Sequence, residues 1–421
     1  MHRRLLAFLP ILLLAISIPA AHAAGIEVKY DDLLKLIDTS HPLIQARRLQ
    51  IQAQKQREGR FKQSFKPRLE LSTSIESFQL GEEDLKTQPS LSAIGIVNLY
   101  NGGRDRLQDS KFAAEARKSE AIMKNLRRNR LANIRHLYWE YLYWQEFIAI
   151  HEEAIQQNQV YLKQAKQRIS AGRANATDRV EFEMKTVALS QEREDARLEI
   201  KRISYEIAIE LGLDGNTRLE INHPYQHEHD DSSIEKLHNE TLEQELIADY
   251  TADIALKSLE LETIDRNFYP KIDVFGGLSQ FNQRERDGST ANDRLEKLVG
   301  LRLSLTLDSS SIRQNEIAAL HLERHAIEQE MLYRQREIEQ EFIADSRKMQ
   351  LLHEQIHGAE ANVKRAQSYL KLTLVDYQRG VKNSSDVVGA AEKKIEFRVI
   401  LAKKIRDYQI LKGHILSEIG R

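Results

Sequence analysis

A seven-residue apolar repeat occurs twice in this sequence, and the second copy lies 208 residues after the first. Its members are Ile134, Tyr141, Ile148, Ile155, Leu162 and Ile169, then Phe342, Met349, Ile356, Val363, Leu370 and Tyr377. A strict seven-residue period places one apolar stripe along a helix and predicts coiled-coil packing against a neighbouring helix. The offset stays constant along both stripes, which indicates an internal duplication.

Each stripe ends at the same short break in the sequence. The breaks are GRANATDRV at 172–180 and GVKNSSDVV at 380–388, and both read G-x-x-N-x-[ST]-D. We predict a helix over 104–170 before the first break, which at about 1.5 Å per residue is on the order of 100 Å long. Further helices are expected over 31–65, with an interruption near His41 and Pro42, and running back after each break over 177–212 and 384–419. Helices of this length form an extended bundle or tube.

Four segments between the helices alternate apolar and polar residues, which is typical of strands with one apolar face. They are 67–79, 91–99, 271–281 and 298–307, joined in pairs by the polar segments 81–90 and 283–296, which we expect to be loops. Tilted strands of about 9–11 residues have the length needed to cross a bilayer in a β-barrel. Two soluble hairpins packed on the helix ends are the alternative, and the strand pattern alone favours them.

The N-terminus has the organisation of a secretory signal peptide. A basic start precedes an apolar core over 5–18 that is too short to span a bilayer as a helix, and Ala21-His22-Ala23 fits a cleavage site. We therefore predict that 1–23 is removed on export. No later segment approaches 18 apolar residues, and the sequence has no cysteine, so neither a membrane helix nor a disulfide is expected.

Export, the missing membrane helices and the length of the coiled coils together favour the barrel. Open sheet edges are not tolerated in lipid, so four strands per chain cannot form a barrel alone. The chain would have to assemble with its own copies, and three copies would supply 12 strands.

Short motifs at the element boundaries resemble those of the TolC family of outer-membrane efflux proteins. They are Ser40-His41-Pro42-Leu43, Phe65-Lys66-Pro67-Arg68-Leu69, Tyr269-Pro270-Lys271-Ile272 and Leu99-Tyr100-Asn101-Gly102-Gly103-Arg104. The order of helix, strand pair, long helix and return helix, repeated twice, is also similar over nearly the whole exported chain. The sequence departs from a symmetric repeat in two places. The second short helix should be about two turns shorter than the first. The segment 307–313, which we interpret as strand, lacks the Gly-Gly that follows the second strand of the first repeat.

The resemblance implies a mostly α fold with a small β part, in which a homotrimer forms a 12-helix periplasmic α-barrel and a 12-stranded outer-membrane β-barrel. It divides the exported chain into a first repeat (24–213), a linker (214–239) and a second repeat (240–421). It further implies a channel in outer-membrane lipid of a Gram-negative bacterium, serving efflux or type I secretion. The partners would be a periplasmic adaptor protein and an inner-membrane pump of the RND, MFS or ABC type.

The breaks would lie at the periplasmic end of such a tube. By resemblance, a latch holding the entrance closed comprises Thr177, Asp178, Tyr377 and Lys382, and Asp386 forms an acidic ring in the pore. Lysine replaces the arginine of the family's best-known member, so a bidentate contact is lost. The turns that would dock the adaptor contain Gly172, Asn175, Gly380 and Asn383.

Ordinary helix capping also accounts for the residue types in the breaks. Glycine suits the left-handed position that ends a helix, which we assign to Gly172 and Gly380. Thr177 or Ser385 is expected to cap the following helix, with an aspartate in its first turn that favours the helix dipole.

The remaining features favour a protein that is neither an enzyme nor a nucleic-acid binder. With 62 Lys+Arg against 63 Asp+Glu, the net charge is −1, and no nucleotide-binding or hydrolase motif is present. His223, His227 and His229 have spacing compatible with zinc, nickel or copper, but a solvated linker is favoured, so no metal or cofactor is predicted. The alternatives to a channel are a periplasmic coiled-coil adaptor and a metal-binding or structural helical protein.

Overall fold

The structure, a computed structural model, describes residues 26–27, 30–57, 59, 65–78, 86–172, 175–213, 219–221, 223–226, 245–282, 293–306 and 310–418. Its helices are α1 (Tyr30–Ser40), α2 (Pro42–Arg57), α4 (Arg104–Ser170), α5 (Ala176–Glu210), α7 (Ala248–Arg266), α8 (Ser310–Arg379) and α9 (Ser384–Glu418). Its strands are β1 (Ile26–Glu27), β2 (Arg68–Phe78), β3 (Lys86–Asn101), β4 (Leu219–Glu220), β5 (Lys271–Asn282) and β6 (Asp293–Ser304). The predicted signal peptide lies outside the described residues.

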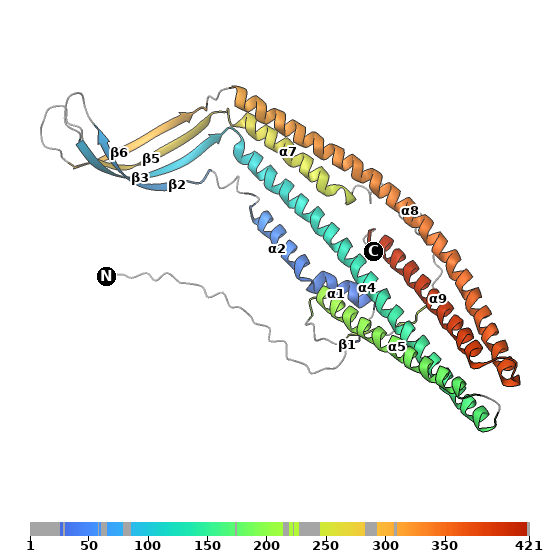
Figure 1. The fold of residues 1–421 in the computed structure, drawn as a ribbon. Helices are drawn as coiled ribbons and strands as arrows, with labels where there is room; N and C mark the ends of the chain where they lie inside the picture. Colours follow the sequence, from blue (N-terminus) through green and yellow to red (C-terminus); the bar gives the residue numbers. More distant parts are fainter. Residues whose placement is uncertain are drawn as a thin grey trace, which may run out of the picture.

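The molecule is elongated, with a small sheet at one end and two helix-to-helix turns at the other (Figure 1). Two long helical hairpins, α4–α5 and α8–α9, lie side by side, with α4 packed against α9. The shorter helices α2 and α7 pack on α4 in the half nearer the sheet, and α7 also packs on α8. At 67 and 70 residues, α4 and α8 are each on the order of 100 Å long, as the sequence predicts.

None of the described helices is long and apolar enough to cross a membrane.

The seven-residue stripes are the packing seams of both hairpins. All twelve stripe residues are buried or half-buried, among them Ile134 and Tyr141 in the first and Met349 and Ile356 in the second. Ile134 packs into a core with residues of α1 and α5, and Ile356 into one with α9. The coiled-coil prediction is confirmed.

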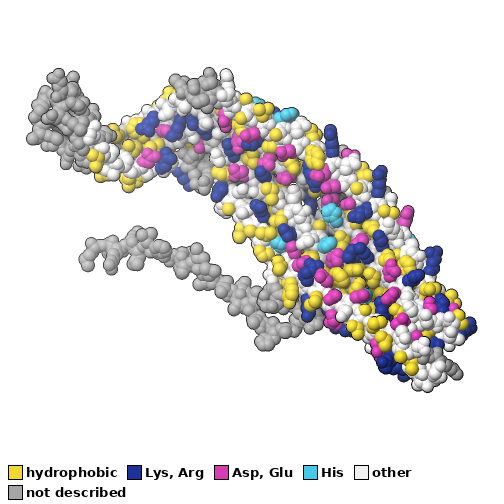
Figure 2. Space-filling view, in the orientation of Figure 1, with side chains coloured by type: hydrophobic (Ala, Val, Ile, Leu, Met, Phe, Trp, Pro, Cys, Tyr) yellow, Lys and Arg dark blue, Asp and Glu magenta, His cyan; other side chains and the backbone are white. Residues whose placement is uncertain are grey.

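The four longer strands form one antiparallel sheet in the order β2-β3-β5-β6. The register pairs Thr73 with Leu91 and Val274 with Leu301. The apolar residues of the edge strand β2 are exposed, with Ile75 at 76%, and those of the other edge strand β6 are as well, with Val299 at 88% (Figure 2). The sheet therefore turns an apolar face outward and leaves the outer sides of β2 and β6 unpaired within the described chain.

Several predicted boundaries are wrong. β3 begins at Lys86 and β6 at Asp293, so each strand extends into a segment predicted as loop. Backbone pairing continues there because it does not require apolar side chains. Within 307–313, interpreted as strand, residues 310–313 form the start of α8. The second short helix is not the shorter one, since α7 has 19 residues and α2 has 16.

Candidate functional site at the hairpin tips

Glycine ends the long helix of each hairpin. Gly172 and Gly380 have φ of 68° and 80°, in the left-handed region that side chains other than glycine adopt at a cost. After α8 the N–H of Val381 donates to the carbonyl of Asp376 at 2.9 Å, and that of Gly380 donates to the carbonyl of Tyr377 at 3.0 Å. This pair of bonds is a Schellman arrangement, which satisfies carbonyls at the end of a helix. The prediction for both glycines is confirmed.

Asparagine occupies the N-cap position of both return helices, and the prediction of Thr177 or Ser385 as caps is wrong. Asn383 accepts the N–H of Asp386 on its side-chain oxygen at 3.0 Å, and Asp386 accepts the N–H of Asn383 on its carboxylate at 3.1 Å. This reciprocal pair is a capping box. Asn175 holds the N-cap position of α5 with an extended backbone but makes no side-chain capping bond. Thr177 lies exposed in the first turn of α5, two positions after the N-cap residue Asn175, and is therefore too late to cap the helix.

An arginine of the first hairpin holds the end of α8. Arg168 lies in the last turn of α4, and its Nη1 donates to the carbonyl oxygen of Tyr377 at 2.6 Å. Its guanidinium also lies 4.2 Å from the centre of the Tyr377 ring. Tyr377 is 1% exposed and packs with Phe182 and Val387. A charged hydrogen bond and a cation–π contact therefore join the two hairpins at their tips.

The starts of the two return helices are joined by a serine. Ser384, the first residue of α9, lies with its Oγ 2.8 Å from Oδ1 of Asp178 on α5 and also within hydrogen-bonding distance of the Glu181 carboxylate. The hydroxyl carries one proton, so it donates to one of these carboxylates at a time. Ser384 is buried and Asp178 is half-buried, so their contact is partly shielded from water.

Asp178 also influences the tyrosine of the predicted latch. Burial raises the pKa of the Tyr377 phenol, the Asp178 charge raises it further, and Arg168 opposes both. The hydroxyl is buried and, within the described residues, makes no hydrogen bond of acceptable geometry. The fold thus brings Tyr377 near Asp178 without a formed bond between them.

Lys382 lies elsewhere within the single chain. Its Nζ is 5.4 Å from the centre of the Tyr369 ring, on its own hairpin. Asp386 is exposed at the tip, with one carboxylate oxygen engaged in the capping box. The latch and the acidic ring stay predictions.

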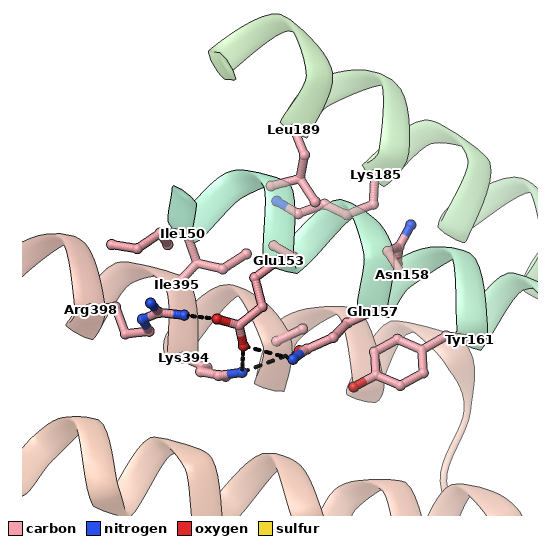
Figure 3. A pocket seen from close by; sticks show the side chains of 12 residues that line it. Ile150, Glu153, Gln157, Asn158, Tyr161, Lys185, Leu189, Lys394, Ile395 and Arg398 are labelled. Carbon is pink, nitrogen blue, oxygen red and sulfur yellow. Dashed lines mark hydrogen bonds and ion pairs between the residues drawn. The ribbon is translucent and has the colours of Figure 1, made fainter. Parts of the chain in front are cut away.

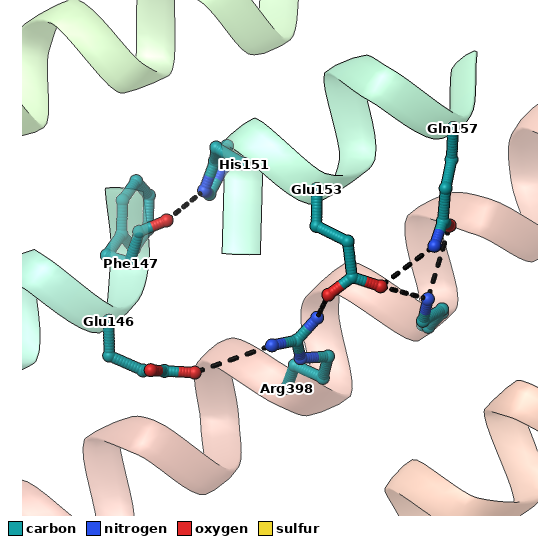
Figure 4. Close-up of polar contacts among 7 residues, drawn as sticks. Glu146, Phe147, His151, Glu153, Gln157 and Arg398 are labelled. Atoms are coloured by element: carbon teal, nitrogen blue, oxygen red, sulfur yellow. Dashed lines mark hydrogen bonds and ion pairs between the residues drawn. The ribbon is translucent and has the colours of Figure 1, made fainter. Parts of the chain in front are cut away.

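A network of ion pairs joins the hairpins farther from the tips (Figure 3). The Glu153 carboxylate on α4 accepts from Lys394 of α9 at 2.9 Å and from Arg398 one turn farther along, and Arg398 also lies 3.4 Å from Glu146 (Figure 4). Burial raises the pKa of Glu146. Burial would also raise the pKa of Glu153, but the bonds from Lys394 and Arg398 outweigh it and lower that pKa. The contribution of Glu153 is therefore present above its unfolded pKa and is lost as the pH falls through the lowered value.

The overall arrangement matches solved outer-membrane channels. The outer-membrane channel OprN superposes with a TM-score of 0.76 at 14% identity, covering 93% of this chain and 89% of that one. VceC of Vibrio cholerae superposes with a TM-score of 0.74 at 14% identity, covering 93% of this chain and 95% of VceC. The open state of MtrE of Neisseria gonorrhoeae superposes with a TM-score of 0.73 at 12% identity, covering 92% of this chain and 88% of MtrE. The chain has the TolC-like channel fold. No family model and no curated protein sequence matches it, so structure alone carries this likeness.

Within the TolC-like fold, the histidines of the inter-repeat segment form no metal centre that the structure describes. His223 is exposed, and its ring lies 6.0 Å from those of Tyr138 and Trp139. His227 and His229 lie outside the described residues. Over the described ranges, no group of three or more His, Cys, Asp or Glu side chains is arranged to hold a metal ion.

Sequence reasoning missed two residues at the tips of this TolC-like chain. One is Arg168, whose place in the last turn of α4 gives only the weak signal that cations favour helix C-termini. The other is Ser384, a small residue beside the capping asparagine. Both act across the hairpins, and the repeat alone does not predict which residues meet there.

Proposed function

We propose that this chain is the outer-membrane channel of an export system and that it works as a homotrimer. The observation on which the proposal rests is that the sheet has an exposed apolar face and two unpaired edges. Its exposed apolar residues on β2 and β6, such as Leu71 and Leu303, would be costly in water but are suited to lipid. The unpaired sides of β2 and β6 would find partners in the sheets of neighbouring copies, which removes the open edges.

The solved structures with this fold support the same function. OprN and MtrE are described as outer-membrane channels. In this chain the long hairpins would form the periplasmic tunnel, and their tips would meet a periplasmic adaptor and an inner-membrane pump of the RND, MFS or ABC type. The alternative of an adaptor predicts one hairpin, whereas the structure has two, α4–α5 and α8–α9.

The tips would form the gate. Thr177, Asp178, Tyr377 and Lys382 would hold the entrance closed, with Lys382 reaching a neighbouring copy. Arg168 and Ser384 would fix the two hairpins of one chain to each other. Charged hydrogen bonds of this kind are each worth about 1.5–3 kcal/mol at most, which a docking adaptor could replace.

Membrane fractionation and electrophoresis test this proposal. The full-length chain, expressed in a Gram-negative host, should remain in the detergent-insoluble outer membrane, cross-link to a trimer and change mobility on heating. A soluble monomer would overturn it. Replacing the exposed pair Val299 and Leu301 by glutamate should prevent membrane assembly, and replacing Glu70 and Ser72 of β2 by glutamine and threonine serves as the matched control.

A further inference from the structure

Two histidines on α8 lie with their ring nitrogens facing each other. Nε2 of His353 is 3.2 Å from Nε2 of His357, and the ring planes meet at 84° with centroids 4.6 Å apart. A spacing of four residues places both side chains on one face of the helix. The Leu352 and Ile356 side chains, packed against α9, hold this turn of α8 in place.

Two imidazole nitrogens at this distance can share either a proton or a metal ion. With metal–nitrogen bonds of about 2.0–2.1 Å, a separation of 3.2 Å corresponds to an N–metal–N angle of roughly 100°. This value lies between the square-planar and tetrahedral angles that imidazole-binding metals adopt. The geometry in place therefore accepts a metal without rearrangement of the helix.

A carboxylate orients one of the two rings. Oε2 of Glu360 is 3.5 Å from Nδ1 of His357. A carboxylate at this position favours the tautomer with the proton on Nδ1, which leaves the lone pair of Nε2 pointing at His353. The His357 side chain is 56% exposed, so an ion can reach the site from solvent.

We propose that His353 and His357 form a binding site for late first-row divalent metal ions, with Cu²⁺ bound more tightly than Ni²⁺ or Zn²⁺. Neutral imidazoles suit these ions, and the preference follows the general order of stability of their complexes. Water completes the coordination, since the described part of the chain adds no third ligand. The site lies roughly 35 Å from the tip of α8, at 1.5 Å per residue, and is separate from the gate.

The same helix contains an internal comparison. His321 and His325 are also four residues apart, yet within the described chain their rings make no contact with each other. Nδ1 of His325 is instead 3.3 Å from Glu328. This pair has the same spacing but not the converging nitrogens, and both of its side chains are exposed, whereas His353 is half-buried.

Copper titration of the purified full-length protein in detergent, followed by electron paramagnetic resonance, tests the site. Wild type should show a two-nitrogen signal that His357→Gln and His353→Gln each weaken on the order of 10-fold, with Glu360→Gln also weakening binding about 10-fold. The control His325→Gln should leave the signal unchanged. Equal titration of wild type and His357→Gln, or an equal loss in His325→Gln, would overturn the site. Circular dichroism should show that each variant remains helical. A weaker copper signal is then due to the missing metal ligand and not to unfolding.

Discussion

The two hairpin tips have the same sequence pattern but different bonding. At the second tip, Asn383 and Asp386 bond to each other and close a capping box within one turn. At the first tip, Asn175 makes no side-chain capping bond, and the corresponding Asp178 accepts instead from Ser384 of the other hairpin. The aspartate at this position of the pattern thus stabilises its own helix in the second repeat, as Asp386, and links the two hairpins in the first repeat, as Asp178. The start of α5 is therefore less completely capped by side chains than the start of α9.

The largest expected effect comes from removing the aromatic side chain at the second tip. Tyr377→Ala should destabilise the tips by about 3–5 kcal/mol, because the fully buried ring leaves a cavity beside Phe182. The corresponding first-repeat variant, Ile169→Ala, should cost less, since Ile169 is only half-buried. Hydrogen exchange of the α8 and α9 termini measures the first loss and that of the α4 and α5 termini the second, and equal losses would contradict the asymmetry.

The next effect concerns the contacts between the hairpins. Asp178→Ala with Tyr377→Phe should increase single-channel conductance in planar bilayers, because it removes one of the two carboxylate acceptors of Ser384 and the phenol beside Asp178. Losing one charged bond of about 1.5–3 kcal/mol shifts a closed–open equilibrium on the order of 10-fold or more. Tyr377→Phe alone is the control and should leave stability nearly unchanged, since its hydroxyl is unpaired in the described chain. Unchanged conductance in the double variant would argue against the latch.

The caps themselves give a smaller difference. Asn383→Ala should destabilise the start of α9 by about 1 kcal/mol, the usual cost of losing an N-cap side chain. Asn175→Ala should cost only a few tenths of a kcal/mol at the start of α5, because no capping bond is lost there. Hydrogen exchange rates of the amides in the first turns of α5 and α9 measure the two losses of stability. Similar losses at both sites would show that the tips are capped alike.

Much of the fold could be predicted from the sequence, because the seven-residue period runs without interruption. The predicted helix over 104–170 coincides with α4, and the four longer strands lie where the sequence predicts them, whereas the two-residue strands β1 and β4 were not predicted. Strand ends in polar segments were missed, since hydropathy does not report backbone pairing beyond the apolar stretch. At the tips, the turn glycines could be predicted from local conformation, whereas the contacts of Arg168 and Ser384 depend on how one hairpin is placed against the other.

The smallest effect on stability is expected for a substitution of Asp386, which should nevertheless change the block of the channel by cations. In a trimer this exposed carboxylate would form a ring of three charges at the entrance and favour cations. Asp386→Asn should preserve most of the capping box, because an amide oxygen can still accept the N–H of Asn383. Stability should therefore change by only a few tenths of a kcal/mol, while block of the channel by trivalent cations in planar bilayers should be lost. Asp178→Asn is the matched control, since the first-tip aspartate is only partly exposed and bonded to Ser384, and it should leave block intact. If trivalent cations fail to block the wild-type channel, the acidic ring is rejected and Asp386 acts only as a capping residue.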